Sequence, residues 1–361
     1  MVSDKQGVNV GHIYSNNPVV EMAQGILPLK DPPFVSIIVA CKSIDSYAKE
    51  CIQGCLQLDY PQFELLVLPD CTENPPNERV RVLTTGHVKP SGKRNIGVNA
   101  AKGELVAFID GDAYPDKDWL KNCIKYFDNP KVAAVGGPGL TPQSDNTMQR
   151  ASGEILSSFL GAGPLSFRHS AKLPRKCDDL PTVNLIVRRS TFKALGGFDS
   201  SYWPGEDTKF CRDLVYRVGE DALYAPDVVV YHHRRLLFRP HLKQIAGYGL
   251  HRGYFAKKFP ENSRRPLYFV PSLFVLGIPA ILLLGYLDES VRFLSLFPLL
   301  AYLLLVGIGA VIIGLKRQKA NLVGPVFLGA VATHLWYGAY FLKGLLSRKI
   351  DTHSASYKSN I

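Results

Sequence analysis

The stretch AFIDGDAYPDKDWL, residues 107–120, joins an apolar run to a pair of acidic side chains. Residues 104–109 (ELVAFI) have the length and the apolar, β-branched composition of a buried strand. The run ends in Asp110 and Asp112, which are separated only by Gly111. Both carboxylates therefore follow the end of a predicted strand, where open α/β sheets bind their ligands.

Strand and helix patterns alternate on both sides of this stretch. We expect further strands at residues 34–40, 63–68, 79–83, 131–137 and 182–189. Helical patterns cover residues 45–58, 91–103, 116–127 and 190–199, and another helix begins at Glu206. Such alternation predicts an α/β domain, Rossmann-like, with a mainly parallel sheet. Asp70 follows the strand at 63–68, so we expect its carboxylate at the same sheet edge as Asp110 and Asp112.

Local signals set the expected helix ends. Ser91 and Ser190 are predicted to begin their helices, since a serine hydroxyl can accept a hydrogen bond from a free backbone N–H. Gly103 is expected just past the end of the first helix, and Gly196 and Gly197 stop the second.

The last part of the 361-residue chain has a different composition. Residues 267–287, 293–315 and 322–342 contain no charged side chain. About 20 uncharged apolar residues are enough to cross the hydrocarbon layer as a helix. We therefore predict an integral, multi-pass membrane protein with three transmembrane helices. The first thirty residues are polar and show no signal-peptide pattern.

The short loops predict an orientation. Arg264 and Arg265 precede the first run, and KRQKAN (316–321) joins the second to the third. By the positive-inside rule, residues 1–266 lie in the cytoplasm and, by parity, the tail lies outside. The tail at 347–361 nevertheless carries Arg348, Lys349 and Lys358, which argue against three full crossings, so its side is left open.

The net charge of +11 is concentrated before the first apolar run. From His232 to Arg265 there are nine Lys or Arg residues and one Glu. The positive-inside rule is sufficient to explain this segment, and binding of anionic lipid headgroups is also expected. Nucleic acid is the weaker interpretation, because no nucleic-acid motif accompanies the charge.

Two carboxylates after a strand suit a divalent cation bound to a phosphorylated substrate. Mg²⁺ and Mn²⁺ prefer oxygen ligands and need only one or two protein carboxylates. The alternative is an ordinary polar turn, since Asp-Gly is a common turn pair. Cys51 and Cys55 lack the second pair that a zinc site needs, so we expect both to pack in the core.

Four motifs follow one another in a specific order: FELLVLPD (63–70), GKRNIGVNAAKGELVAFIDGDAYPD (92–116), VNLIVRRSTFKALGGFD (183–199) and GEDTKFCRDL (205–214). With them, the chain from Phe34 to Arg235 resembles the family 2 glycosyltransferases, which have the GT-A fold. The apolar runs and KQIAGYGLHRG (243–253) resemble the membrane-bound branch that includes succinoglycan-type exopolysaccharide glycosyltransferases of the cell envelope. The Gln/Arg-x-x-Arg-Trp motif of processive synthases is missing, which argues against a processive polymerase.

The resemblance assigns roles to individual residues. It implies a nucleotide-sugar site formed by Asp70, Lys93, Arg94, Asp110 and Asp112. Asp112 and His232 would hold the Mg²⁺ or Mn²⁺ ion. Asn184, Gly197 and Trp203 would shape the acceptor side.

Asp207 would be the general base, with Glu206 beside it. A carboxylate is needed there to deprotonate an acceptor hydroxyl for in-line, inverting attack. A helix-capping role is the alternative for Asp207. His232 could equally be an ordinary exposed histidine, and for His334, inside the third apolar run, a helix–helix hydrogen bond is favoured over a functional role.

These interpretations give five segments: an N-terminal extension at 1–33, a glycosyltransferase domain at 34–235, a basic membrane-interface segment at 236–266, the transmembrane helices within 267–346, and the tail. The predicted function is a metal-dependent, inverting, hexosyltransferase-type enzyme. It would transfer sugar from a nucleotide-diphosphate sugar to a lipid-linked or polysaccharide-precursor acceptor. One alternative is an enzyme that glycosylates a polyisoprenyl phosphate; another is a non-catalytic protein that binds nucleotide sugars or lipid. The sugar, the linkage and the oligomeric state are not fixed by the sequence.

Overall fold

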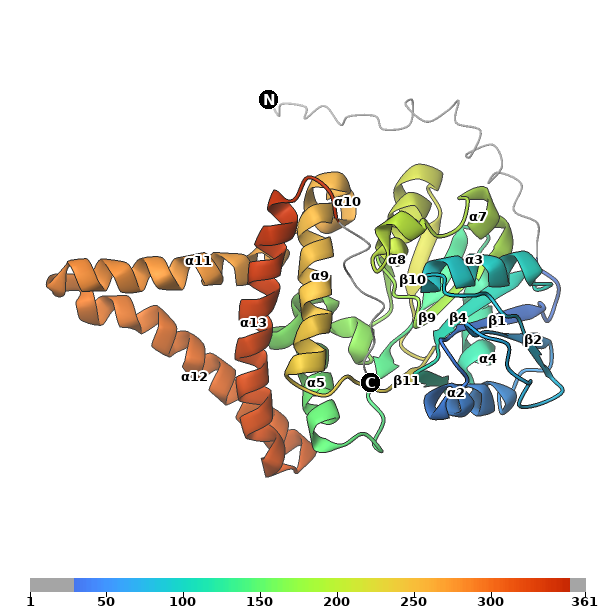
Figure 1. The fold of residues 1–361 in the computed structure, drawn as a ribbon, viewed down its shortest axis with the longest axis horizontal. Helices are drawn as coiled ribbons and strands as arrows, with labels where there is room; N and C mark the ends of the chain where they lie inside the picture. The colour runs from blue at the N-terminus through green and yellow to red at the C-terminus, as the bar shows by residue number, and fades with distance from the viewer. Residues whose placement is uncertain (1–28, 351–361) are drawn as a thin grey trace, which may run out of the picture.

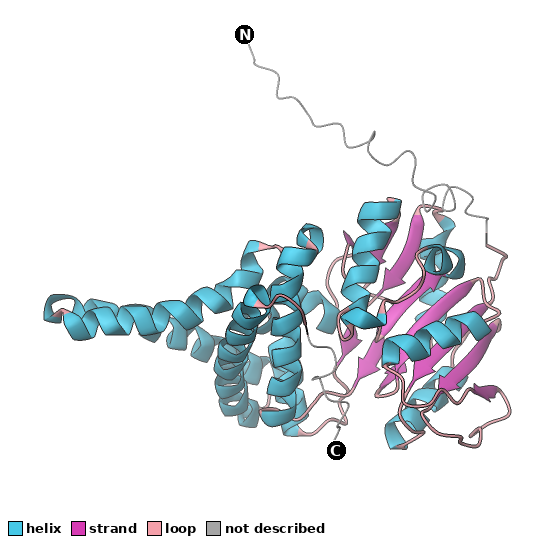
Figure 2. Ribbon diagram, turned by 45° about the horizontal axis from the view of Figure 1, so that its top comes forward, coloured by secondary structure: helices cyan, strands magenta, loops and turns pink. Residues whose placement is uncertain are grey.

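The computed structural model describes residues 29–350, so most of the expected N-terminal extension and the end of the tail, with Lys358, lie outside the described residues. An eight-stranded sheet forms the centre of the N-terminal domain (Figure 2), in the order β3-β2-β1-β4-β9-β6-β10-β8. Its strands are β1 (Val35–Ala40), β2 (Phe63–Leu68), β3 (Val80–Val82), β4 (Leu105–Asp110), β6 (Val132–Gly136), β8 (Arg175–Cys177), β9 (Asn184–Arg188) and β10 (Asp221–Tyr224).

The sheet is mainly parallel, as predicted. β1 pairs in parallel with β2 and β4, β2 with β3, and β6 with β10. β9 is antiparallel to both β4 and β6, and β8 is antiparallel to β10. The carboxyl ends of β1, β2 and β4 meet at one edge, which brings the segments carrying Asp70 and Asp110 together.

A second, three-stranded sheet lies beside this edge. It consists of β5 (Ala113–Pro115), β7 (Gly139–Leu140) and β11 (Val230–His232), in the order β5-β11-β7. β5 begins directly after Asp112, so the small sheet continues the chain from the acidic pair.

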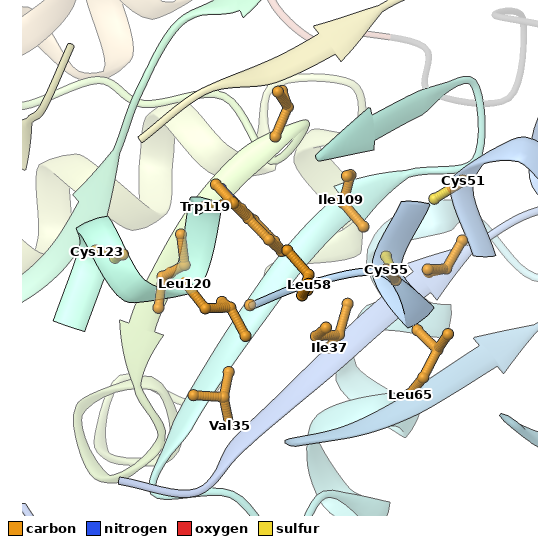
Figure 3. Packing of buried hydrophobic residues seen from close by; sticks show 14 of the residues in the cluster. Val35, Ile37, Cys51, Cys55, Leu58, Leu65, Ile109, Trp119, Leu120 and Cys123 are labelled. Atoms are coloured by element: carbon orange, nitrogen blue, oxygen red, sulfur yellow. The ribbon is translucent and has the colours of Figure 1, made fainter. Parts of the chain in front are cut away.

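Helices cover both faces of the large sheet (Figure 1). α2 (Ser46–Leu56) and α4 (Trp119–Ile124) pack on one face, and α3 (Pro90–Ala100), α7 (Arg189–Ala194) and α8 (Glu206–Asp213) pack on the other. Cys51 and Cys55 of α2 lie in the first of these layers with Ile37, Leu65 and Trp119 (Figure 3). The core-packing interpretation of the two cysteines is therefore confirmed.

Several predicted helix boundaries are wrong by a few residues. The helix expected at 116–127 is only α4, followed by a 3₁₀ turn at Lys125–Asp128. α3 begins at Pro90 and α7 at Arg189, so Ser91 and Ser190 lie inside these helices and do not cap them. Proline is favoured in the first turn because its missing N–H would have no partner there anyway.

Gly103 does not end α3, which stops at Ala100. A Cβ atom on Gly103 would lie 2.5 Å from the backbone nitrogen of Ser36 and 2.6 Å from the carbonyl oxygen of Leu105. The glycine is therefore needed for the close approach of this loop to β1. Gly103 N–H also donates to Ser36 Oγ at 2.8 Å.

The C-terminal part forms α9 (Arg239–Lys258), α10 (Pro260–Ser263), α11 (Pro266–Leu287), α12 (Arg292–Arg317) and α13 (Val323–Leu346). α11, α12 and α13 are long and apolar enough to cross a membrane, so three candidate membrane helices follow the α/β domain as predicted. His334 of α13 accepts a hydrogen bond from Tyr302 of α12 (2.8 Å) and donates to the Leu160 carbonyl (2.7 Å). The helix–helix hydrogen bond expected for His334 is confirmed.

We predict that Gly103→Ala destabilises the domain by about 1–3 kcal/mol, because the added methyl group overpacks against backbone atoms that cannot move independently. Thermal unfolding of the detergent-solubilised chain measures the effect. Gly92→Ala in α3 is the control, since the nearest atom to its added Cβ is 3.8 Å away. Equal stability of the two variants would contradict the tight packing at Gly103.

Candidate active site

The small sheet brings the acidic pair and one histidine together. β11 runs antiparallel to β5, and its register places His232 opposite Ala113, next to Asp112. One ligand atom each from Asp110, Asp112 and His232 lies within 4.8 Å of the other two. Within residues 29–350, this is the group of His, Cys, Asp and Glu side chains that could hold a metal ion.

The chemistry of this group fits Mg²⁺ or Mn²⁺. Two carboxylates supply hard oxygen ligands, and an imidazole is compatible with Mn²⁺. The side chains of Asp110, Asp112 and His232 are 30%, 23% and 15% exposed, so a ligand from solvent can reach all three. The alternative of an ordinary polar turn does not explain why His232 is delivered to the same place by a different strand.

His232 and Arg235 lie beside Asp112. Its Oδ1 lies 3.3 Å from His232 Nε2, and its Oδ2 lies 3.2 Å from a terminal nitrogen of Arg235. Burial by itself would raise the pKa of Asp112, but His232 and Arg235 hold it well below its usual range. The carboxylate is thus ionised and able to bind a cation at neutral pH.

Arg94 connects the acidic pair to the start of α8. One terminal nitrogen lies 2.6 Å from Asp110 Oδ1 and the other lies 3.0 Å from Glu206 Oε1. The side chains of Arg94 and Glu206 are almost fully buried. Burial would lower the pKa of Arg94, but Asp110 and Glu206 raise it, so the guanidinium stays charged.

Glu206 and Asp207 differ in what they can do. Burial and the neighbouring Asp207 raise the pKa of Glu206 to about 8. Glu206 faces Arg94 in the interior, whereas Asp207 is only half-buried and accepts a hydrogen bond from Thr208 N–H at 2.7 Å. Burial and then Asp179 raise the pKa of Asp207, while Arg168 opposes them. A half-buried carboxylate with a raised pKa suits a general base.

Asp70 and Lys93 form a buried ion pair at the end of β2. Lys93 Nζ contacts Asp70 and donates to the carbonyls of Cys41 (2.6 Å) and Leu68 (3.1 Å). These contacts use its three N–H donors, and its side chain is 1% exposed. Lys93, which was predicted to be part of the nucleotide-sugar site, therefore orients Asp70 within it. Burial would raise the pKa of Asp70, but Lys93 and His87 lower it.

The residues expected on the acceptor side have different surroundings. Asn184 is fully buried, accepts from Trp119 Nε1 (2.9 Å) and donates to the Val228 carbonyl (2.7 Å). It supports the sheet and offers no surface to an acceptor. Gly197 has φ +76°, and a Cβ there would lie 2.8 Å from Asn95 Oδ1. Trp203 is half-buried just before α8.

Several contributors were missed. Arg235 contacts Asp112, and His87 contacts Asp70. Nothing in the local sequence of either residue indicates that it belongs to the site. Asp179 was also missed: it pairs with Arg168 (2.5 Å) and Arg252 (2.6 Å) and accepts a hydrogen bond from Thr208 Oγ1 (2.9 Å). The acidic pair Asp178-Asp179 was a signal that could have been noticed, although its partners lie far away in the sequence.

The fold has a counterpart among solved structures. The mannosyltransferase PcManGT from Pyrobaculum calidifontis, solved in complex with GDP-Man and Mn²⁺, superposes with a TM-score of 0.51 at 18% identity. The likeness covers 88% of this chain and 88% of that one. Together, the sheet order and the carboxylates at its edge define a glycosyltransferase fold of the GT-A type.

The sequence comparisons identify the family. The model described as "Glycosyltransferase like family 2" matches residues 32–246, and the chain belongs to this family. The pre-mycofactocin glycosyltransferase of Mycobacterium tuberculosis is 30% identical over 186 residues, 51% of this chain and 38% of that protein. The chain thus spans well under two thirds of the length of that relative.

Another relative matches over nearly its full length. The dolichyl N-acetyl-alpha-D-glucosaminyl phosphate 3-beta-D-2,3-diacetamido-2,3-dideoxy-beta-D-glucuronosyltransferase of Methanococcus voltae is 23% identical over 333 residues. The match covers 87% of this chain and 97% of that protein, so it extends beyond the α/β domain into the C-terminal part.

If Asp207 is the base, activity falls as pH drops through its raised pKa. Asp179→Asn removes a negative charge that raises this pKa and leaves Arg168 to lower it further. We therefore predict that the acid limb of kcat/KM moves to lower pH, by roughly half a unit or more. Asp178→Asn is the matched control, because Asp178 pairs with Arg265 and not with the groups around Asp207. An unmoved limb, or one moved to higher pH, would exclude this assignment.

Proposed function

We propose that the chain is a membrane-anchored, inverting glycosyltransferase that uses a nucleotide-diphosphate sugar with Mg²⁺ or Mn²⁺. The observation that carries the proposal is the arrangement around Arg94. A candidate metal site, Asp110, Asp112 and His232, lies on one side, and the acidic start of α8 lies on the other. Donor activation and acceptor deprotonation thus have separate groups in one site.

Each side has a defined task in the transfer reaction. Asp110, Asp112 and His232 would hold the divalent ion, which when bound stabilises negative charge on the departing nucleotide diphosphate. Asp70, held by Lys93 and His87, would accept a hydrogen bond from the nucleotide base. Asp207 takes the proton from the acceptor hydroxyl as the new glycosidic bond forms and the bond to the nucleotide breaks. Attack from the side opposite the leaving group inverts the anomeric centre.

The proposed acceptor is lipid-linked or a polysaccharide precursor, used at the cytoplasmic face during synthesis of a cell-envelope or exopolysaccharide glycan. The candidate membrane helices support this proposal. The Methanococcus voltae relative, whose name specifies a dolichyl phosphate-linked sugar acceptor, also supports it. The exposed basic residues before α11 would favour an anionic lipid surface.

Asp112→Asn and Asp207→Asn should each lower sugar transfer by about 10²–10⁴-fold. They should differ in donor binding. Asp112→Asn weakens metal-dependent binding of the nucleotide sugar, whereas Asp207→Asn leaves it intact. The measurement is nucleotide release and Mn²⁺-dependent binding over a panel of UDP-, GDP- and dTDP-sugars. Asp118→Asn, on the same segment but outside the site, is the control. Full transfer activity in both site variants would overturn these two assignments, whereas nucleotide-sugar binding with no transfer by the unaltered chain would favour a non-catalytic binding protein.

The acceptor is tested by analysis of the product. With lipid extract as acceptor, we expect the radiolabelled sugar in the organic phase, and mild acid should release it as part of a larger saccharide. Release of the labelled monosaccharide alone would instead show transfer to a polyisoprenyl phosphate. Equal rates with detergent-soluble saccharides would remove the basis for a lipid-linked acceptor.

A further inference from the structure

α9 and α13 lie side by side and run in the same direction (Figure 1). The matched positions are His241 with Thr333, Gly249 with Tyr337, Gly253 with Phe341, and Lys257 with Ser347. In each pair, the residue number on the α13 side exceeds that on α9 by nearly the same amount. The contacts therefore advance along both helices together, which shows that the helices are parallel. At Gly249 and Gly253, a Cβ atom would clash with the α13 backbone. This is the close helix contact that small residues four apart permit.

α9 cannot accompany a helix through hydrocarbon. Its 20 residues include five Lys or Arg side chains: Arg239, Lys243, Arg252, Lys257 and Lys258. Each costs about 2.5–3.5 kcal/mol at the centre of a membrane helix. α9 is also fixed to the catalytic domain, since Arg252 pairs with Asp179 and His241 bonds Ser152 (2.7 Å).

The first half of α13 is held in the same way. α5 (Thr147–Ser157) packs against it, and a Cβ on Gly329 would lie 2.7 Å from Ile155 Cδ1. Just before α13, Asn321 donates to Thr147 Oγ1 at 3.4 Å. α13 therefore lies against elements of the catalytic domain over most of its length.

α11 and α12 have a different environment. Only 11% of the most apolar window of each is buried, against 33% for α13. They project away from the domain as a hairpin, and α13 runs across its base (Figure 1). The 22 residues of α11 give a length of about 33 Å, which matches a hydrocarbon layer of about 30 Å. The charged residues Asp288 and Glu289 lie at the tip of the hairpin, beyond that length.

The outward face of α13 is apolar and has a polar-aromatic border. Leu328, Leu335 and Leu346 are exposed by 56%, 41% and 81% and lie on one line of the helix. The tilted rings of Trp336 and Tyr340 neighbour each other beside this line, and Lys343 lies over the Tyr340 ring. Apolar residues bordered by Trp, Tyr and Lys are typical of a helix that lies in the membrane surface.

We propose that α11 and α12 alone cross the membrane, and that α13 lies along the membrane surface on the side of the catalytic domain. Its apolar face contacts the membrane at the boundary between lipid headgroups and acyl chains. The residues that follow Leu346 then stay on the catalytic side, which accounts for the charges of Arg348 and Lys349. This topology does not depend on which sugar is transferred.

Labelling with a membrane-impermeant maleimide in sealed vesicles tests the crossings. Exposed Cys71 of the catalytic domain is the internal reference. Ser290→Cys at the hairpin tip and Lys349→Cys after α13 report the other two positions. We expect Cys71 and position 349 to react from one side and position 290 from the other, as read by peptide mass spectrometry. Reaction of position 349 from the side opposite Cys71 would establish three crossings and overturn the proposal, as would position 290 reacting on the same side as Cys71.

A depth measurement provides an independent test on the full chain in nanodiscs. Spin labels at Leu328, Leu335 and Leu346 should report nearly equal depths. If α13 crossed the bilayer, the outer two would differ by about 27 Å along the helix. Labels at Leu273 and Leu284 of α11 are the matched control and should show a steep gradient, about 16 Å over the same helix face. A steep gradient along α13 would exclude the surface position.

Discussion

The site depends on one buried guanidinium. Arg94 comes from α3, Asp110 from the end of β4, and Glu206 from the start of α8, so three segments converge on one cation. A buried charge is tolerated only when its partners compensate for lost hydration, and removing one partner is strongly destabilising. Asp110 supplies an opposite charge, and Glu206 supplies a buried hydrogen-bond acceptor. The candidate metal site and the acidic start of α8 are therefore held at a fixed separation by Arg94.

A second set of buried charges connects this site to the membrane elements. Asp179 forms ion pairs with Arg168 and with Arg252 of α9, and it accepts a hydrogen bond from Thr208 of α8. α8, which carries the proposed base in its first turn, therefore shares an acidic partner with α9, which packs on α13. Movement of α9 would change the field around Asp207 as well as its position. The start of α8 and the helix that packs on α13 are thus linked through side chains that are paired and buried.

Features that depend on local sequence pattern, such as strand positions, could be predicted from the sequence. Side-chain contacts that depend on segments far apart in the chain could not. Strand periodicity located β1, β2, β4, β6 and β9, and a strand end followed by carboxylates located Asp110 and Asp112. His232 beside the acidic pair was implied by the family resemblance, and the structure places it at the end of β11. Lys93 was assigned to the nucleotide, but Asp70 and two carbonyls occupy its ammonium. No local pattern distinguishes a lysine that meets a ligand from one that meets a buried carboxylate.

The same reasoning explains the limits of hydropathy at the C-terminus. The length and composition of α13 show that it can enter a membrane, but its neighbours determine how it lies. Gly249 and Gly253 allow α9 to approach its backbone, and His241 joins α5, α9 and α13 through hydroxyl groups of Ser152 and Thr333. Arg252, counted in the sequence as part of a basic surface, is buried and holds α9 to the catalytic domain. α13 is bound along one face to the charged helix α9, and separating the two would expose these groups. We therefore infer that α9 determines how deeply α13 can enter the membrane.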